Sequence, residues 1–319
     1  MTTSKSADTP PVGESLGRAF ELVCPSCHGP LGSGPLRCEA CGRAFRVHEG
    51  VPVFLDPDGW EAARSARAVP SRARDDYSRV RRACILTQMY YDAWVDRLLA
   101  EVPRDGGALV ELMCGEGELS RRLPPWVRAA LAVDRDPEAA QVAARDLAHD
   151  RRVTVAVGDA TALPVATGGA SAVVIIGGLH HARPELARIL REVARVLRPR
   201  GVLVASEPAN DHPLVRRVRR WQYSRSTSQG HDPDEDGFTR GELELAMAPH
   251  GLRLATYDVF GFVAYPLMGN TDLLPLLEGA RSRLLGRALL GLDAALERVP
   301  VIRRLGWASR FVARREATV

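Results

Sequence analysis

Two short apolar runs of the chain each end in residues suited to binding a nucleoside. Residues 109–112 contain Glu111 and lead into the turn 113–117, and residues 131–133 lead into Asp134. A glycine-bearing turn after a buried strand lets backbone N–H groups approach a polar ligand, and a carboxylate at the next strand end suits ribose hydroxyls. These residues therefore indicate a nucleoside-cofactor site.

The following segments read as the elements that position this site. Residues 153–157 form a third apolar run before Asp159, and residues 171–176 form a fully apolar fourth run. Residues 186–197 have helical apolar periodicity, and residues 201–206 read as a fifth strand. Strands alternating with helices predict an α/β fold with a mostly parallel sheet and helices on both faces.

This order of strand, acid, Gly-x-Gly, strand and acid resembles the seven-stranded, Rossmann-like methyltransferases that use S-adenosylmethionine. A dinucleotide fold would need a third glycine where this chain has Ser120. Residues 179–201 are similar to the quinone-biosynthesis methyltransferase subgroup. The resemblance covers most of residues 106–264, and it implies a seven-stranded sheet and S-adenosylmethionine as the cofactor.

The resemblance also implies roles for individual residues. Asp134 is expected to bind the ribose hydroxyls, and Asp159 the adenine amino group, although either acid could instead cap a helix. Met113 departs from the pattern, which commonly has a glycine at that position. The full set of expected cofactor-binding residues is Glu111, Met113, Gly115, Gly117, Asp134, Arg135, Asp159, Ala160 and Gly177.

His180 and His181 directly follow the fourth strand and are the candidate catalytic residues. A histidine there can accept a proton from an attacking hydroxyl or amine. Two alternatives remain open. One of the two histidines could only pack against the loop, or methyl transfer could rely on proximity and alignment without a base.

Four cysteines form a second chemical pattern near the N-terminus. Cys24 and Cys27 form one Cys-x-x-Cys knuckle, and Cys38 and Cys41 form another after a gap of ten residues. Four thiolates can enclose Zn²⁺ without leaving an open coordination position, so such a metal would be structural. The pattern is similar to zinc ribbons that precede several bacterial methyltransferases. A redox or disulfide pair and a bound iron are the alternatives.

The flanking segments are candidates for substrate binding. Residues 85–99 read as an amphipathic helix whose Tyr90, Tyr91 and Trp94 could cover the site or belong to the core. Residues 209–238, with His231, form a long polar insertion that suggests a lid. Residues 265–306 are rich in leucine and suit a substrate cover, a dimer contact or a membrane-surface helix, of which we favour the cover.

The composition excludes few functions. The net charge of +4 is small for 319 residues, and Lys5 is the one lysine beside many arginines, so charge alone does not predict a nucleic-acid partner. We find no run of about 18 apolar residues. The expected divisions are a flexible tail (1–20), a zinc ribbon (21–58), a linker with cap helices (59–105) and the methyltransferase domain (106–319) with two lid insertions.

Together these features predict a cytoplasmic methyltransferase that acts on a small, partly apolar metabolite. The alternatives are an RNA base methyltransferase that uses the ribbon to dock RNA, and a non-catalytic cofactor-binding scaffold. The linker before residue 85 has acids among its arginines and few aromatics, unlike a surface that stacks RNA bases. Since the cysteines lie far from Asp134 in sequence, we also expect metal loss to leave cofactor binding largely intact.

Overall fold

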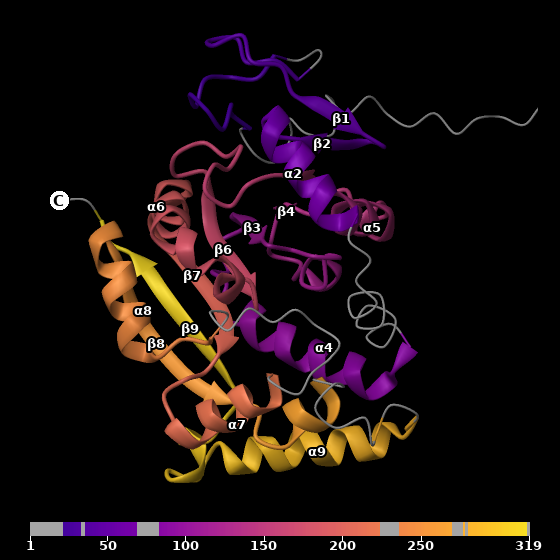
Figure 1. The fold of residues 1–319 in the computed structure, drawn as a ribbon, viewed down its shortest axis with the longest axis vertical. Coiled ribbons are helices and arrows are strands. Elements are labelled where there is room, and N and C mark those ends of the chain that lie inside the picture. The colour runs from indigo at the N-terminus through magenta and orange to yellow at the C-terminus, as the bar shows by residue number, and fades with distance from the viewer. Residues whose placement is uncertain are drawn as a thin grey trace, which may run out of the picture.

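The computed structural model describes residues 22–32, 36–68, 83–223, 236–269, 277 and 280–317. Within these residues the strands form one sheet of nine, in the order β1-β2-β5-β4-β3-β6-β7-β9-β8 (Figure 1). The sequence predicted seven strands and a separate ribbon. The number is wrong because β1 and β2, from the N-terminal segment, extend the methyltransferase sheet.

The seven remaining strands confirm the predicted α/β fold. β3 to β7 are mutually parallel, and β9 runs antiparallel between β7 and β8. β4, β5 and β6 are apolar over most of their length because helices cover both faces of the sheet. The strands are β3 (Ala108–Leu112), β4 (Ala129–Asp134), β5 (Val153–Val157), β6 (Ala170–Ile176), β7 (Leu197–Pro208), β8 (Leu252–Phe260) and β9 (Ala308–Arg315).

Helices pack on the two faces through alternate strand residues. Leu131 and Val133 of β4 face the cluster that contains α6 and α8, whereas Ala130 and Ala132 face the side that carries α4 and α5. The helices are α2 (Pro57–Ala68), α4 (Ile85–Leu99), α5 (Pro137–Leu147), α6 (Leu186–Val196), α7 (Pro213–Tyr223), α8 (Arg240–Met247) and α9 (Arg283–Leu296). The short helical turns are η1 (Ser120–Arg122), η2 (Leu179–Glu185), η3 (Ala248–His250), η4 (Tyr265–Gly269) and η6 (Ile302–Arg304).

A tight hairpin joins the N-terminal segment to the sheet. β1 (Arg46–His48) and β2 (Val51–Val53) are connected by Glu49 and Gly50, whose φ angles are 47° and 82°. Positive φ at both turn residues matches the twist of the flanking strands. β2 then pairs with the edge strand β5 in parallel, and α2 buries Trp60 against the same hydrophobic cluster as α5.

The leucine-rich segment before β9 forms α9, which packs against α4. Asp293 of α9 is 4% exposed and accepts hydrogen bonds from the N–H groups of Phe262, Val263 and Ala264. This carboxylate therefore fixes the chain between β8 and η4. No helix in the described part of the chain is long and apolar enough to cross a membrane.

Candidate cofactor cavity and metal centre

A cavity of about 500 Å³ opens at the carboxyl ends of β3, β4, β5 and β6. Such a volume is typical of small-molecule sites, and this edge of a parallel sheet is where ligands bind. Further lining comes from the start of α6. The predicted site residues that line it are Met113, Asp134, Arg135, Asp159, Ala160, Gly177 and His181.

Asp134 is fixed by the backbone around it. Its Oδ2 accepts a hydrogen bond from the Gly115 N–H at 2.7 Å, and its Oδ1 accepts one from the Asp136 N–H at 2.8 Å. Burial raises the pKa of the Asp134 carboxyl, against the effect of these N–H donors. Each carboxylate oxygen can accept a second hydrogen bond, so Asp134 still has capacity for a pair of hydroxyls.

Asp159 lies on the next loop, after β5. Its Oδ1 accepts hydrogen bonds from the N–H of Thr161 at 2.8 Å and the hydroxyl of Thr161 at 2.7 Å. Its Oδ2 has no partner among the described residues and is available to a ligand donor. Ala160 follows in the same loop and lines the cavity.

Met113 takes a backbone conformation that explains why a glycine is common there. Its φ is 57°, in the left-handed region, where a side chain costs about 1–2 kcal/mol. A Cβ added to Gly178 would lie 2.4 Å from the Met113 sulfur, so the opposite loop must carry a glycine. The methionine therefore narrows the cavity between the loops after β3 and β6.

Glu111, Gly115 and Gly117 are not among the residues that line this cavity. Glu111 is 3% exposed and accepts hydrogen bonds from the N–H groups of Leu119 and Ser120 and from the Ser120 hydroxyl. Burial raises the pKa of Glu111 to about 7, although the Ser120 hydrogen bonds oppose this shift. Glu111 thus holds the turn after β3 against η1, and its cofactor contact stays a prediction.

His180 is held by a carboxylate that the sequence reasoning missed. The Nδ1 atom of His180 lies 2.7 Å from Oε2 of Glu207, at the end of β7. Glu207 is buried and also accepts hydrogen bonds from the N–H groups of Gly178, Leu179 and His180. Because all these partners donate to it, Glu207 favours the tautomer in which His180 carries its proton on Nδ1.

The two histidines differ in position. The side chain of His180 is 12% exposed and does not line the cavity, whereas His181 does. Their ring centroids lie 3.9 Å apart. Of the two histidines predicted from sequence, His180 is therefore held by Glu207 and His181 lines the cavity. Glu207 contacts Nδ1 of His180 and leaves its Nε2 atom free of that contact.

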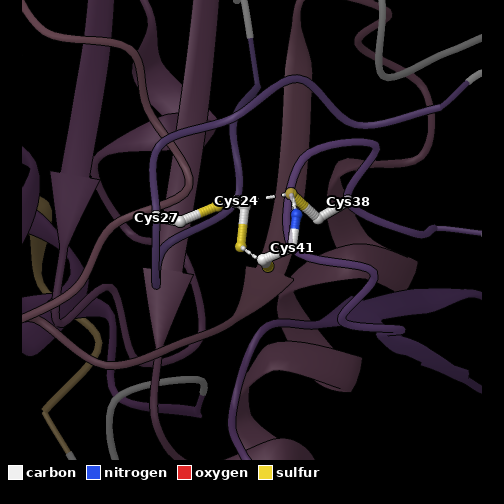
Figure 2. Close-up of side chains that lie close together, drawn as sticks. All are labelled: Cys24, Cys27, Cys38 and Cys41. Carbon is white, nitrogen blue, oxygen red and sulfur yellow. Dashed lines mark hydrogen bonds between the residues drawn. The ribbon is translucent and has the colours of Figure 1, made fainter.

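The four N-terminal cysteines converge on one point (Figure 2). Their sulfur atoms all lie within 4.8 Å of one another, with Cys24 and Cys41 at 3.8 Å and Cys27 and Cys38 at 3.4 Å. A tetrahedral Zn²⁺ with bonds of about 2.3 Å places its sulfurs roughly 3.8 Å apart, so the cluster fits zinc. The Cys41 N–H helps lower the pKa of Cys38 to about 6, while side-chain hydrogen bonds to the other cysteines raise the pKa of Cys27, so the two thiols are linked in the cluster.

The N-terminal part of the chain that holds the four cysteines and the β1–β2 hairpin, residues 22–54, is called the metal segment below. It contacts the chain on both sides of the loop that carries Asp159. Before that loop, Phe54 donates its N–H to the Val157 carbonyl at 2.8 Å. After it, Val23 donates its N–H to the Pro164 carbonyl at 3.2 Å. Val23 directly precedes the ligand Cys24, so the metal segment and this cavity loop are joined by backbone hydrogen bonds.

A largely buried ion pair in α6 holds the chain directly after the same loop. Glu192 accepts the Leu163 N–H at 2.6 Å and pairs with Arg195 at 2.7 Å. Arg195 in turn donates to the carbonyls of Leu163 and Val165. The sequence reasoning gave these residues no role because their partners are about thirty positions away.

The predicted cap residues lie away from the cavity. Tyr90, Tyr91 and Trp94 belong to α4 and are buried in an aromatic cluster with Phe260 and Tyr265. The Tyr90 hydroxyl and the Trp94 N–H have no hydrogen-bond partner in the described part of the chain. His231 lies outside the described residues.

Comparisons with known proteins support the class of protein that this fold defines. Residues 109–201 match the methyltransferase domain family, and residues 22–50 match the Trm112p-like protein family. The chain is similar to one chain of a structure described as the complex between the Haloferax volcanii Trm112 methyltransferase activator and the putative methyltransferase. This match has 18% identity over 82% of this chain and 100% of that chain, with a TM-score of 0.51.

A second similar structure is a putative sarcosine dimethylglycine methyltransferase from Galdieria sulphuraria. It has 16% identity over 72% of this chain and 86% of that chain, with a TM-score of 0.49. The chain thus carries a methyltransferase domain and a Trm112-like zinc ribbon, and S-adenosylmethionine and zinc are the cofactors that fit these two parts. The quinone-biosynthesis subgroup stays a prediction.

Proposed function

We propose that this methyltransferase acts on a small, partly apolar metabolite. The observation that carries the proposal is the His180–Glu207 pair, which stands at the sheet edge next to the cofactor cavity. The elements α4, η4 and α9 contribute mostly apolar side chains to one hydrophobic cluster, against which Ile176 at the end of β6 also packs. These apolar side chains therefore favour an acceptor that carries its hydroxyl or amine on an apolar molecule.

In this proposal, S-adenosylmethionine supplies an electrophilic methyl group when bound. Asp134 holds the ribose hydroxyls and Asp159 the adenine amino group, each with the acceptor capacity described above. Glu207 keeps the Nδ1 proton of His180 in place. Nε2 of His180 then accepts the proton that the acceptor loses on methylation.

Methyl labelling distinguishes this proposal from the RNA alternative. The purified protein is incubated with labelled S-adenosylmethionine and either total RNA or a small-molecule extract, at low and at high salt. We expect label in the extract only, with little salt dependence. Salt-sensitive labelling of RNA would show an RNA methyltransferase, since contacts to phosphates release counterions.

A variant of Asp134 tests whether the cofactor binds in this cavity. Asp134→Ala should weaken S-adenosylhomocysteine binding by roughly 1.5–3 kcal/mol, the scale of hydrogen bonds to a charged group. Calorimetry measures this affinity directly. Unchanged affinity in the variant would remove Asp134 from the cofactor site.

We further propose that the Trm112-like segment supports the methyltransferase domain within the same chain. In the Haloferax volcanii complex, the Trm112 protein is a methyltransferase activator. Support for a similar role here comes from the pairing of β2 with β5 and from the hydrogen bond that the Val23 N–H donates to the Pro164 carbonyl. The activator role would then be a built-in property of this chain.

A further inference from the structure

The solvent side of α9 is apolar along its length. Leu284 is 76% exposed, Leu292 45% and Leu285 36%. Ala288, Gly291 and Ala295 are also exposed on this side, and the exposed residues Arg283 and Arg287 lie along one edge of it. The opposite side of the helix buries Gly286 and Asp293. Helices of globular proteins normally turn polar residues to water, so this outward side lacks its usual composition.

Positive charges surround this apolar side. The flanking arginines are Arg281, Arg283, Arg287, Arg298, Arg303 and Arg304. The two acids of the same segment are already engaged. Asp293 is buried against backbone N–H groups, and Glu297 pairs with Arg97 at 2.6 Å. The outward side of α9 and its flanking arginines, called the α9 face below, therefore combine exposed leucines with uncompensated positive charge.

Nearby elements carry further exposed apolar side chains. Val301, which follows α9, is 78% exposed, and Leu214 and Trp221 of α7 are 57% and 55% exposed. The start of α7 and the end of α9 line one cavity, and Figure 1 shows both helices at the same end of the molecule. Exposed tryptophan and leucine among arginines is the composition of helices that lie in a membrane interface.

We propose that the α9 face docks on an anionic lipid bilayer. The leucines would enter the interface while the arginines meet the lipid headgroups, so both the apolar area and the charge find partners. A second copy of this chain fits less well. A two-fold contact through the α9 face would bring two sets of arginines together, and the two acids of the segment are already engaged with backbone N–H groups and with Arg97.

Docking would also place α4 and η4 close to the membrane. α9 packs on α4, and α4 packs on η4. If the proposed apolar acceptor is correct, it could reach the enzyme from the bilayer. The docking itself does not depend on that reaction, and its test requires no turnover.

Co-sedimentation with lipid vesicles tests the proposal. One set of vesicles is pure phosphatidylcholine, and the other contains equal parts of phosphatidylcholine and phosphatidylglycerol. We expect binding to the second set only, weakened by salt. Leu284→Ser with Leu292→Ser should reduce it roughly tenfold or more, and so should Arg283→Gln with Arg287→Gln.

Leu245→Ser is the matched control, because Leu245 is 78% exposed but lies on α8. It should leave vesicle binding unchanged, and all variants should keep their melting temperature and their S-adenosylhomocysteine affinity. Equal binding to both vesicle sets, or unchanged binding in the leucine variant, would overturn the proposal. Absence of vesicle binding together with a dimer that Leu284→Ser dissociates would assign the α9 face to self-association instead.

Discussion

At the residue scale, Glu207 shows how one buried carboxylate can organise a loop and a side chain together. It accepts three backbone N–H groups of the loop after β6 and also faces Nδ1 of His180. The backbone bonds satisfy its charge, while the side-chain contact selects one orientation of the imidazole. Loop structure and the proposed base therefore depend on the same group.

We predict that the two histidines contribute unequally. His180→Ala should lower kcat on the order of 10²-fold, because the proposed base is lost. His181→Ala should have the smaller effect on kcat, since the Glu207 carboxylate orients the ring of His180. Steady-state kinetics on the identified acceptor measures both, with S-adenosylhomocysteine affinity as the check on the cofactor site.

Glu207→Gln separates positioning from catalysis. The amide oxygen can take the place of Oε1 and accept the N–H groups of Gly178 and Leu179, but an NH₂ group in the place of Oε2 cannot accept hydrogen bonds from the backbone N–H or the Nδ1–H of His180. We expect kcat to fall while KM and the melting temperature change little, and Glu207→Asp to recover part of the loss. Normal rates in both His180→Ala and His181→Ala would leave proximity as the source of catalysis.

Glu111 predicts a pH-dependent stability. Its pKa is raised from 4.5 to about 7 by burial, so between these values the folded state keeps a proton that the unfolded state has released. The free energy of unfolding must then fall as pH rises through this window. Glu111→Gln does not ionise, and its amide oxygen can take the place of Oε2 and still accept the N–H and the hydroxyl of Ser120, while the longer hydrogen bond from the Leu119 N–H to Oε1 is lost.

Between pH 4.5 and pH 7, the free energy of unfolding of Glu111→Gln should therefore rise by about 3 kcal/mol relative to that of the wild type. Denaturant unfolding without cofactor at several pH values measures this difference. Other carboxyls titrate equally in both proteins, so they cancel. A constant difference across the window would mean that Glu111 is ionised in the folded protein throughout.

At the element scale, the local sequence was sufficient to predict a strand or helix wherever its apolar residues formed a continuous run or a helical pattern. The fully apolar run at residues 171–176 became β6, and the helical pattern at residues 85–99 became α4 with the same bounds. Both elements are defined by which of their own residues must avoid water. That information lies within the segment itself.

Features that depend on distant pairing were not predictable in this way. β2 joins the sheet through Val53 and Val157, which are separated by about a hundred positions. Glu207 and His180 are 27 positions apart, and a lone acid before a proline has no pattern that points to a histidine. The cysteine cluster was the exception, because two short knuckles carry its ligand set.

The cap helix shows a third kind of discrepancy. Tyr90, Tyr91 and Trp94 were expected either to cover the site or to form core, and their burial supports the core. Periodicity alone could not separate the two possibilities, because a substrate cover and a core helix both need an apolar side.

At the scale of the whole molecule, the structure links two sites that are far apart in sequence. The Asp159 loop is bonded to the metal segment at Val157 on one side and at Pro164 on the other. Cys24 adjoins Val23, so a metal that orders Cys24 also orders this contact. This geometry reverses our expectation that metal loss would leave cofactor binding largely intact.

We therefore predict a measurable coupling between zinc and cofactor. Cys24→Ser with Cys38→Ser, or removal of zinc by a chelator, should weaken S-adenosylhomocysteine binding by about 5- to 150-fold, the usual range for coupled sites. The physical reason is that an unanchored loop must be ordered when the ligand binds, which costs conformational entropy. Isothermal calorimetry on the metal-loaded and metal-free protein gives the factor.

Thermodynamic linkage gives a second, independent test of this coupling. If zinc tightens cofactor binding by a given factor, S-adenosylhomocysteine must tighten zinc binding by the same factor. A competing chelator measures the zinc affinity with and without the ligand. Cys84→Ser is the control, because Cys84 is buried at the start of α4, outside the metal cluster. It should leave both affinities unchanged. Equal S-adenosylhomocysteine affinities with and without zinc would show that the two hydrogen-bonded contacts do not transmit order, and that the Trm112-like segment serves another purpose.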